Sequence, residues 1–324
     1  MISISGTSAS CQRAATRAQD GNDFALPAKL RNSNGLVTPP PGPSLPARGL
    51  AFQAREIEEL ADVYFFRPLG ILVARPAATL GLTPTQITFA SMLVGVLGAA
   101  LLYDPRLGLP AFVLLIAYSI LDSADGQLAR LTGQVTELGR VLDGVIGYVV
   151  YTALYLALTA GLLHRGASGT IVVWMLLAVI SNIAQAQMYD YHRHHYVSIV
   201  VRGTIVRDDP AKISSPLIAW IYRGYLALQR GLNGLHGEVE KRIGARAHDG
   251  VVPAPDQARY RACFYRPVRG WNLLGDNTRF YAIGLLALIH RLDLFFSFIV
   301  VPMNLALVAL WFWQRQADRR FLRS

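Results

Sequence analysis

Long apolar runs separated by short polar turns make up most of the chain from residue 76 onward. Four of these runs contain no charged residue, namely 76–103, 144–163, 166–189 and 294–314. A helix needs roughly 20 apolar residues to cross a bilayer. Each of the four runs therefore predicts a membrane-spanning helix.

Two further runs are less regular. Leu107–Leu121 is short, but a helix that continues through the acidic segment after it can cross, with its acidic end at the membrane surface. Phe280–Ile289 spans only if its helix begins near Trp271 and accepts Asp276 and Arg279 inside the membrane or at its rim, where polar residues are costly. The pattern thus predicts an all-α integral membrane protein with six transmembrane helices.

Residues 55–81 precede the first span and mix charge with apolar sequence. Arg67 and Arg75 are embedded in apolar residues, and Pro68 and Pro76 interrupt the run. We expect an N-terminal amphipathic helix that lies along the lipid headgroups. The alternative is an ordinary amphipathic helix packed on the protein.

The remaining polar segments flank this membrane domain, which we assign to residues 55–324. Residues 1–54 are rich in Ser, Pro, Ala and Gly and predict a disordered cytoplasmic extension. We expect a cytoplasmic insertion at about 190–275. Its one helical signal is an apolar stripe at spacings of three and four, and the rest, including PAPDQARYRACFYRPVR, is predicted to be a basic linker. The stripe consists of Leu217, Ile221, Tyr225, Leu228, Leu232 and Leu235.

Charge gives the orientation. The chain is 52% hydrophobic and 16% charged, with a net charge of +10, and 28 of its 31 basic residues are arginines that flank the apolar runs. This distribution favours membrane topology over a nucleic-acid partner. The loops predicted outside, 103–109, 163–169 and 290–293, carry one basic residue each, whereas the tail after residue 314 carries four. Both termini and the acidic cluster described next are therefore predicted to be cytoplasmic, in a membrane that we take to be a bacterial inner membrane.

Three aspartates stand out at the predicted cytoplasmic ends of two helices. Asp122 and Asp125 are three residues apart and share one helix face. After a turn, the next helix carries Gly139, Asp143 and Gly147 on one face at four-residue spacing. Two helices packed side by side can then bring three carboxylates to one point, where they repel unless cations neutralise them. Oxygen ligands alone favour Mg²⁺ or Mn²⁺; the alternative is that each aspartate is a solvated charge at a helix end.

The segment DSADGQLARLTGQVTELGRVLDGVIG resembles the signature of the CDP-alcohol phosphotransferase family, D-x₂-D-G-x₂-A-R-x₈-G-x₃-D-x₃-D. Seven of the eight fixed positions match, and TPTQIT at 83–88 is similar to the TPNxxT element of that family. The matching positions are Asp122, Asp125, Gly126, Ala129, Arg130, Gly139 and Asp143.

The resemblance implies a six-helix membrane enzyme that displaces CMP from a CDP-linked lipid, such as CDP-diacylglycerol, by the hydroxyl of a small or lipid alcohol. It implies that Asp122, Asp125 and Asp143 bind Mg²⁺ or Mn²⁺, with two ions expected. Gly126, Ala129 and Gly139 would give the CDP moiety room, and Arg130 would hold this region or its phosphates. Because many relatives are homodimers, a homodimer is one assembly state that the resemblance implies.

The eighth position departs from the signature. The family has an aspartate there, commonly credited as metal ligand and as the base that activates the attacking hydroxyl, and this chain has Gly147. One alternative is that His192, His194 or His195 supplies the base. A second is a slow enzyme without a base. A third is a non-catalytic homologue that binds CDP-lipid and metal without turnover.

A membrane prenyltransferase is a different enzyme class that also places aspartate-rich helix ends and Mg²⁺ around a diphosphate. That class resembles two separated aspartate-rich motifs, and Asp208–Asp209 lacks the spacing of a second one. The sequence therefore favours the phosphotransferase. The identity of the acceptor alcohol stays open.

Overall fold

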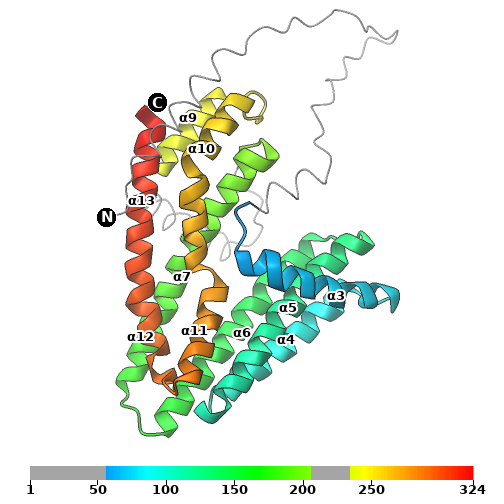
Figure 1. Cartoon of the computed structure of the whole chain (residues 1–324), viewed down its shortest axis with the longest axis vertical. Helices are drawn as coiled ribbons and strands as arrows, with labels where there is room; N and C mark the ends of the chain where they lie inside the picture. Colours follow the sequence, from blue (N-terminus) through cyan, green and yellow to red (C-terminus); the bar gives the residue numbers. More distant parts are fainter. Residues whose placement is uncertain (1–55, 206–233, 324) are drawn as a thin grey trace, which may run out of the picture. The chain divides into compact units, whose positions relative to one another are not determined.

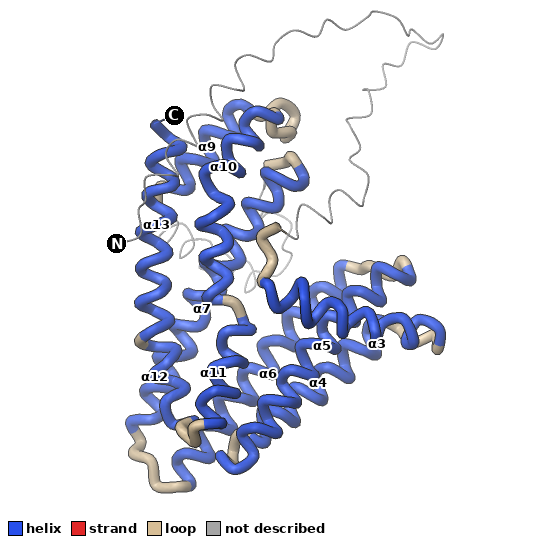
Figure 2. Tube along the Cα trace, viewed as in Figure 1, coloured by secondary structure: helices blue, strands red, loops and turns tan. Residues whose placement is uncertain are grey.

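The computed structural model describes residues 56–205 and 234–323, and the elements in these ranges are helical (Figures 1 and 2). The α-helices are α3 (Arg67–Thr79), α4 (Pro84–Leu101), α5 (Gly108–Thr132), α6 (Glu137–His164), α7 (Thr170–Tyr196), α9 (His236–Arg246), α10 (Ala254–Trp271), α11 (Asp276–Leu288), α12 (Phe295–Val300) and α13 (Pro302–Arg323). Short π- or 3-10-helical segments are η1 (Asp62–Phe66), η2 (Pro105–Leu107), η3 (Val197–Arg202), η5 (Asn272–Leu274) and η6 (Leu292–Leu294). The prediction of an all-α membrane protein is confirmed.

Five helical stretches of the described chain are long and apolar enough to cross a membrane. They are Pro84–Leu101, Pro105–Thr132, Leu142–His164, Thr170–Arg202 and Leu292–Arg323. The sixth predicted span is broken, since α11 begins at Asp276 after the η5 turn and has 13 residues. At 1.5 Å per residue this helix covers about 20 Å, less than a hydrocarbon core of roughly 30 Å. A sixth span therefore stays a prediction.

The chain divides into two compact units, which we describe separately. One unit comprises Glu58–Tyr189 and Trp271–Ala309, and it contains α3 to α6, most of α7, α11 and α12. The described part of the other unit contains the end of α7, α9, nearly all of α10 and the end of α13. The aspartates of the signature all lie in the first unit.

Within the first unit, α4 packs along both α5 and α6. Gly95 lies where the three helices meet: a Cβ added there would be 2.7 Å from Val150 Cγ2 of α6 and 3.0 Å from Tyr118 Cδ2 of α5. Small residues at membrane-helix interfaces allow the backbones to approach closely. The glycine therefore sets how closely α4 approaches α5 and α6.

The predicted N-terminal amphipathic helix corresponds to η1 and α3. One face of α3 packs against α5, with Gly70, Ala74 and Ala77 buried. Leu72 and Leu80 are exposed. The helix is thus partly packed on protein, as the alternative prediction had it, and its placement along the headgroups stays a prediction.

The second unit contains more structure than the sequence predicted. The segment PAPDQARYRACFYRPVR, predicted to be a linker, lies almost entirely in α10. The prediction was wrong because Tyr260, Phe264 and Val268 recur at helical spacing and are buried. The predicted extension at 1–54 lies outside the described residues, as does nearly all of the apolar stripe that begins at 217.

We predict that Gly95→Leu destabilises the first unit. The larger side chain overlaps Val150 and Tyr118, and overpacking of this kind costs typically about 1–3 kcal/mol. The matched control is Gly144→Leu, since a Cβ at Gly144 of α6 meets nothing within 4 Å. Thermal unfolding in detergent should show a lower midpoint for Gly95→Leu and a nearly unchanged one for Gly144→Leu; equal midpoints would contradict the packing.

Candidate active site

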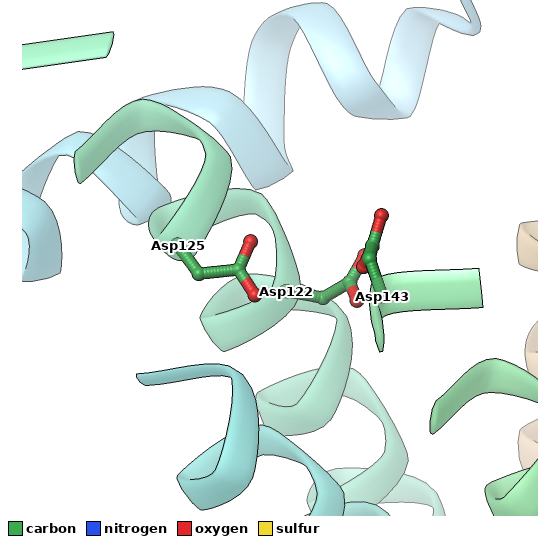
Figure 3. A group of neighbouring side chains, drawn as sticks. All are labelled: Asp122, Asp125 and Asp143. Atoms are coloured by element: carbon green, nitrogen blue, oxygen red, sulfur yellow. The ribbon is translucent and has the colours of Figure 1, made fainter. Parts of the chain in front are cut away.

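Three carboxylates converge between α5 and α6 (Figure 3). Asp122 and Asp125 lie about one turn apart on α5, and Asp143 lies on α6. One carboxylate oxygen from each residue lies within 4.8 Å of the other two. Asp125 is buried, Asp122 is half-buried and Asp143 is exposed. The convergence predicted from the spacing is therefore present.

The turn between the helices explains this convergence. Gly133 follows α5 with a φ of 70°, a left-handed conformation that glycine adopts readily. Its N–H bonds to the carbonyl of Ala129. Thr136 then caps α6, because its hydroxyl accepts a hydrogen bond from Gly139 N at 3.0 Å. The chain reverses within a few residues, which returns Asp143 to the level of the α5 aspartates.

A threonine of α4 holds the most buried carboxylate. Thr88 Oγ1 donates a hydrogen bond of 2.6 Å to Asp125 Oδ2. Thr88 ends the TPTQIT element, whose first residue, Thr83, forms a capping box with Gln86 and fixes where α4 begins. The sequence placed this element at the start of a span but did not reveal the contact with Asp125.

A pocket of about 480 Å³ opens beside the aspartates. The residues that line it come from the start of α4, the end of α5, the turn and the start of α6. They are Pro84, Thr85, Thr88, Asp125, Gly126, Ala129, Arg130, Gln134, Val135, Thr136, Gly139 and Asp143. All four residues that the resemblance assigns to the CDP moiety are among them, so the pocket lies where the sequence predicted a nucleotide.

One cation stands at the rim of this pocket. Arg130 is exposed, and its guanidinium approaches the bare face of Gly126, since a Cβ added to Gly126 would lie 3.5 Å from Arg130 Nη1. The charges of Arg67, Glu58 and Asp125 all interact electrostatically with this guanidinium. A site with an arginine beside carboxylates suits a ligand that carries both phosphates and metal ions.

The position that departs from the signature faces open space. Gly147 lies one turn after Asp143, and the atom nearest to a Cβ added there is Tyr118 Oη at 4.0 Å. Tyr118 lies one turn before Asp122 on α5, so the aromatic hydroxyl and the aspartate share a face. The sequence spacing could have pointed to this tyrosine, but an aromatic residue in an apolar run is indistinguishable there from a core residue.

The histidines considered as an alternative base belong to the second unit. His192 and His195 are buried and His194 is exposed. His195 Nδ1 lies 2.9 Å from Glu240 Oε1. Burial acts to raise the pKa of Glu240, but the hydrogen bonds with His195 and Tyr191 and the charges of His195 and His236 together outweigh it, so the pKa is lowered overall. None of the three histidines is among the described residues that line the pocket.

The donor set fits a hard divalent cation. Three carboxylates at this separation repel one another, and burial makes that repulsion stronger. Mg²⁺ and Mn²⁺ prefer oxygen ligands, and the three aspartates offer nothing else. The cluster could therefore hold a metal ion.

We predict that Thr88→Val lowers stability, because the buried Asp125 carboxyl group loses its hydroxyl donor. Leaving such a group without its partner costs about 1–3 kcal/mol. Thr85→Val is the matched control, since Thr85 lies on the same helix and lines the same pocket but is exposed. Thermal unfolding of both variants checks this; equal midpoints would show that the Thr88 hydrogen bond contributes little.

Comparisons with known proteins agree with the resemblance. The family model described as CDP-alcohol phosphatidyltransferase matches residues 81–228. The chain is 31% identical over 93 residues to an archaetidylinositol phosphate synthase of Pyrococcus horikoshii, which covers 29% of this chain and 49% of that protein. It is 31% identical over 115 residues to a bifunctional IPC transferase and DIPP synthase of Aquifex aeolicus, which covers 35% of this chain and 24% of that protein.

The matches thus span about half or less of these relatives. No solved structure matches the chain. The matched region contains α4, α5, α6 and α7 as well as every position of the signature. Residues 81–228, a little under half of the chain, are therefore similar to the CDP-alcohol phosphatidyltransferase family.

Proposed function

We propose that the protein is a membrane phosphotransferase of phospholipid synthesis. It transfers a substituted phosphate group, such as a phosphatidyl group, from a CDP-linked lipid to the hydroxyl of a small or lipid alcohol, with release of CMP. The observation that carries this proposal is the convergence of Asp122, Asp125 and Asp143 beside a pocket lined by Gly126 and Arg130. The names of the matched relatives, both synthases or transferases, support the same class.

In this proposal the three aspartates hold Mg²⁺ or Mn²⁺, with two ions expected. When bound, such ions neutralise the pyrophosphate and the departing CMP. Thr88 keeps Asp125 in place for that role through its hydrogen bond. The carboxylates themselves contribute orientation and charge, and no thiol or imidazole competes for the ion among the described residues of this cluster.

The residues around the pocket bind the nucleotide end of the donor. Ala129 and Gly139 line the pocket without bulk, and Gly126 leaves the α5 backbone open to close approach. Arg130 offers a planar guanidinium that can bind a phosphate through two hydrogen bonds. The lipid tail of the donor stays in the bilayer while its charged end enters the pocket at the ends of the helices, which we place on the cytoplasmic side of a bacterial inner membrane.

We predict metal-dependent release of CMP from CDP-diacylglycerol by the purified protein when a panel of alcohols is supplied. Asp143→Asn should abolish the release, because the cluster loses one of its three charges. Chelation of Mg²⁺ and Mn²⁺ should do the same. The matched control is Asp104→Asn, since Asp104 caps η2 through Oδ1, and asparagine caps equally well.

The same assay separates the alternatives. Release that needs metal and is lost in Asp143→Asn identifies the enzyme and its acceptor. If the wild type releases no CMP and Gly147→Asp does, the protein is a homologue that binds donor and metal without turnover. Release of pyrophosphate from a prenyl diphosphate would instead favour the prenyltransferase.

We also predict that Ala129→Leu weakens binding of CDP at least about tenfold, because the new side chain occupies space in the pocket. Mn²⁺ binding, measured by electron paramagnetic resonance, should remain, since no carboxylate is changed. Ala100→Leu serves as the control, because Ala100 is an exposed residue of α4 outside the pocket lining. Unchanged CDP affinity in Ala129→Leu would place the nucleotide elsewhere.

A further inference from the structure

The surface beside Gly147 is where the family signature would place its last carboxylate. Asp143, Gly147 and Tyr151 follow one another at four-residue intervals along one face of α6. Because Gly147 has no side chain, and Tyr118 Oη is the atom nearest to where its Cβ would be, this stretch of α6 is open to groups from other helices.

A carboxylate from a distant part of the sequence reaches this face. Tyr151 Oη donates a hydrogen bond of 2.8 Å to Asp276 Oδ1 at the start of α11. Side chains on a helix lean toward its N-terminus, so the Tyr151 hydroxyl lies over the turn that contains Gly147. The Asp276 carboxylate therefore accepts its hydrogen bond from a hydroxyl that leans toward the turn of the missing aspartate.

Aromatic packing fixes the start of α11 in this place. Phe280, one turn after Asp276, stacks on Tyr151 with ring centroids 5.8 Å apart and an interplanar angle of 11°. Its ring also meets Tyr118 edge-to-face at 6.1 Å. The same two tyrosines thus border Gly147 and hold the helix that carries Asp276.

A buried arginine binds the same carboxylate oxygen as Tyr151. Arg279 is fully buried, and its Nη1 donates to Asp276 Oδ1 at 3.2 Å and to the carbonyl of Leu274 at 3.0 Å. The side chain of Asp276 is nevertheless 64% exposed, so it remains accessible to a substrate. The negative charge of Asp276 interacts electrostatically with the Tyr118 hydroxyl and with the Asp122 carboxyl group.

We propose that Asp276 accepts the proton of the attacking hydroxyl, in place of the carboxylate that Gly147 lacks. This inference rests on the proposed function. The acceptor oxygen forms a bond to the phosphorus that carries the lipid group, its proton passes to Asp276, and the bond from that phosphorus to the bridging oxygen breaks so that CMP leaves with the electron pair. Tyr151 and Arg279 are positioning residues for Asp276.

The test is Asp276→Asn, assayed with the alcohol that supports release of CMP by the wild type. Asparagine keeps an oxygen that can accept from Tyr151 and Arg279, so the helix start is preserved, but it cannot accept the proton. Loss of a general base typically lowers the rate about 10²–10⁴-fold. We expect a fall of at least about 100-fold, with binding of CDP-diacylglycerol in the absence of acceptor unchanged. Asp293→Asn is the matched control, since Asp293 is an exposed aspartate paired with Arg291.

Rescue gives a second readout that a purely structural role would not produce. The double variant Gly147→Asp with Asp276→Asn restores a carboxylate on the same face, and the free space at Gly147 admits it. We expect it to be at least about tenfold faster than Asp276→Asn alone.

The outcomes distinguish this inference from the proposed function. An active wild type with Asp276→Asn within about threefold of it would overturn the role of Asp276 and leave the proposed function standing. Parallel loss of donor binding in Asp276→Asn, or a double variant no faster than the single one, would overturn that role as well. A wild type that releases no CMP with any acceptor would overturn both.

Discussion

The mutual repulsion of Asp122, Asp125 and Asp143 is the constraint on which the first unit depends. Two of these carboxylates lie on α5 and one on α6, so the repulsion acts to separate the two helices. α4 opposes the separation because it packs along both of them, and Gly95 allows the close approach. The same helix supplies Thr88 as a hydrogen-bond donor to the most buried carboxylate. Packing and hydrogen bonding thus hold an arrangement that bound cations would complete.

How much of the site could be predicted depended on how local its geometry is. Asp122 and Asp125 share a helix face by spacing alone, and a short turn with Gly133 returns the chain so that Asp143 meets them. Thr88 contacts Asp125 across 37 residues of sequence, through the packing of α4 on α5. Nothing in the local pattern reports such a contact, because a threonine in a span can equally bond its own helix backbone, as Thr88 also does to the carbonyl of Pro84.

The second unit was underestimated for a related reason. Frequent arginines made α10 look like a linker, although Tyr260, Phe264 and Val268 follow one another at four-residue spacing and are buried. His236 of α9 is buried as well, hydrogen-bonded to Asp318 at 2.7 Å and to the Tyr260 hydroxyl at 3.0 Å. From the sequence alone, a polar residue that is buried and hydrogen-bonded cannot be distinguished from an exposed one. The polar composition of this segment therefore did not indicate that it is folded.

The buried Arg279 is the strongest physical reason to regard the start of α11 as a functional part of the protein. Burying a guanidinium is costly unless its donors are paired, and in a membrane protein such residues usually mark functional places. Here Gln185 accepts from Arg279 Nη2 at 3.2 Å and donates in turn to Asn304 at 2.8 Å, so α7 and α13 contribute polar groups to support one cation. An apolar residue at this position would avoid that cost and pack against the same helices. What it would not provide is a charge that, together with the Tyr151 hydroxyl, holds Asp276 still while leaving its carboxylate exposed.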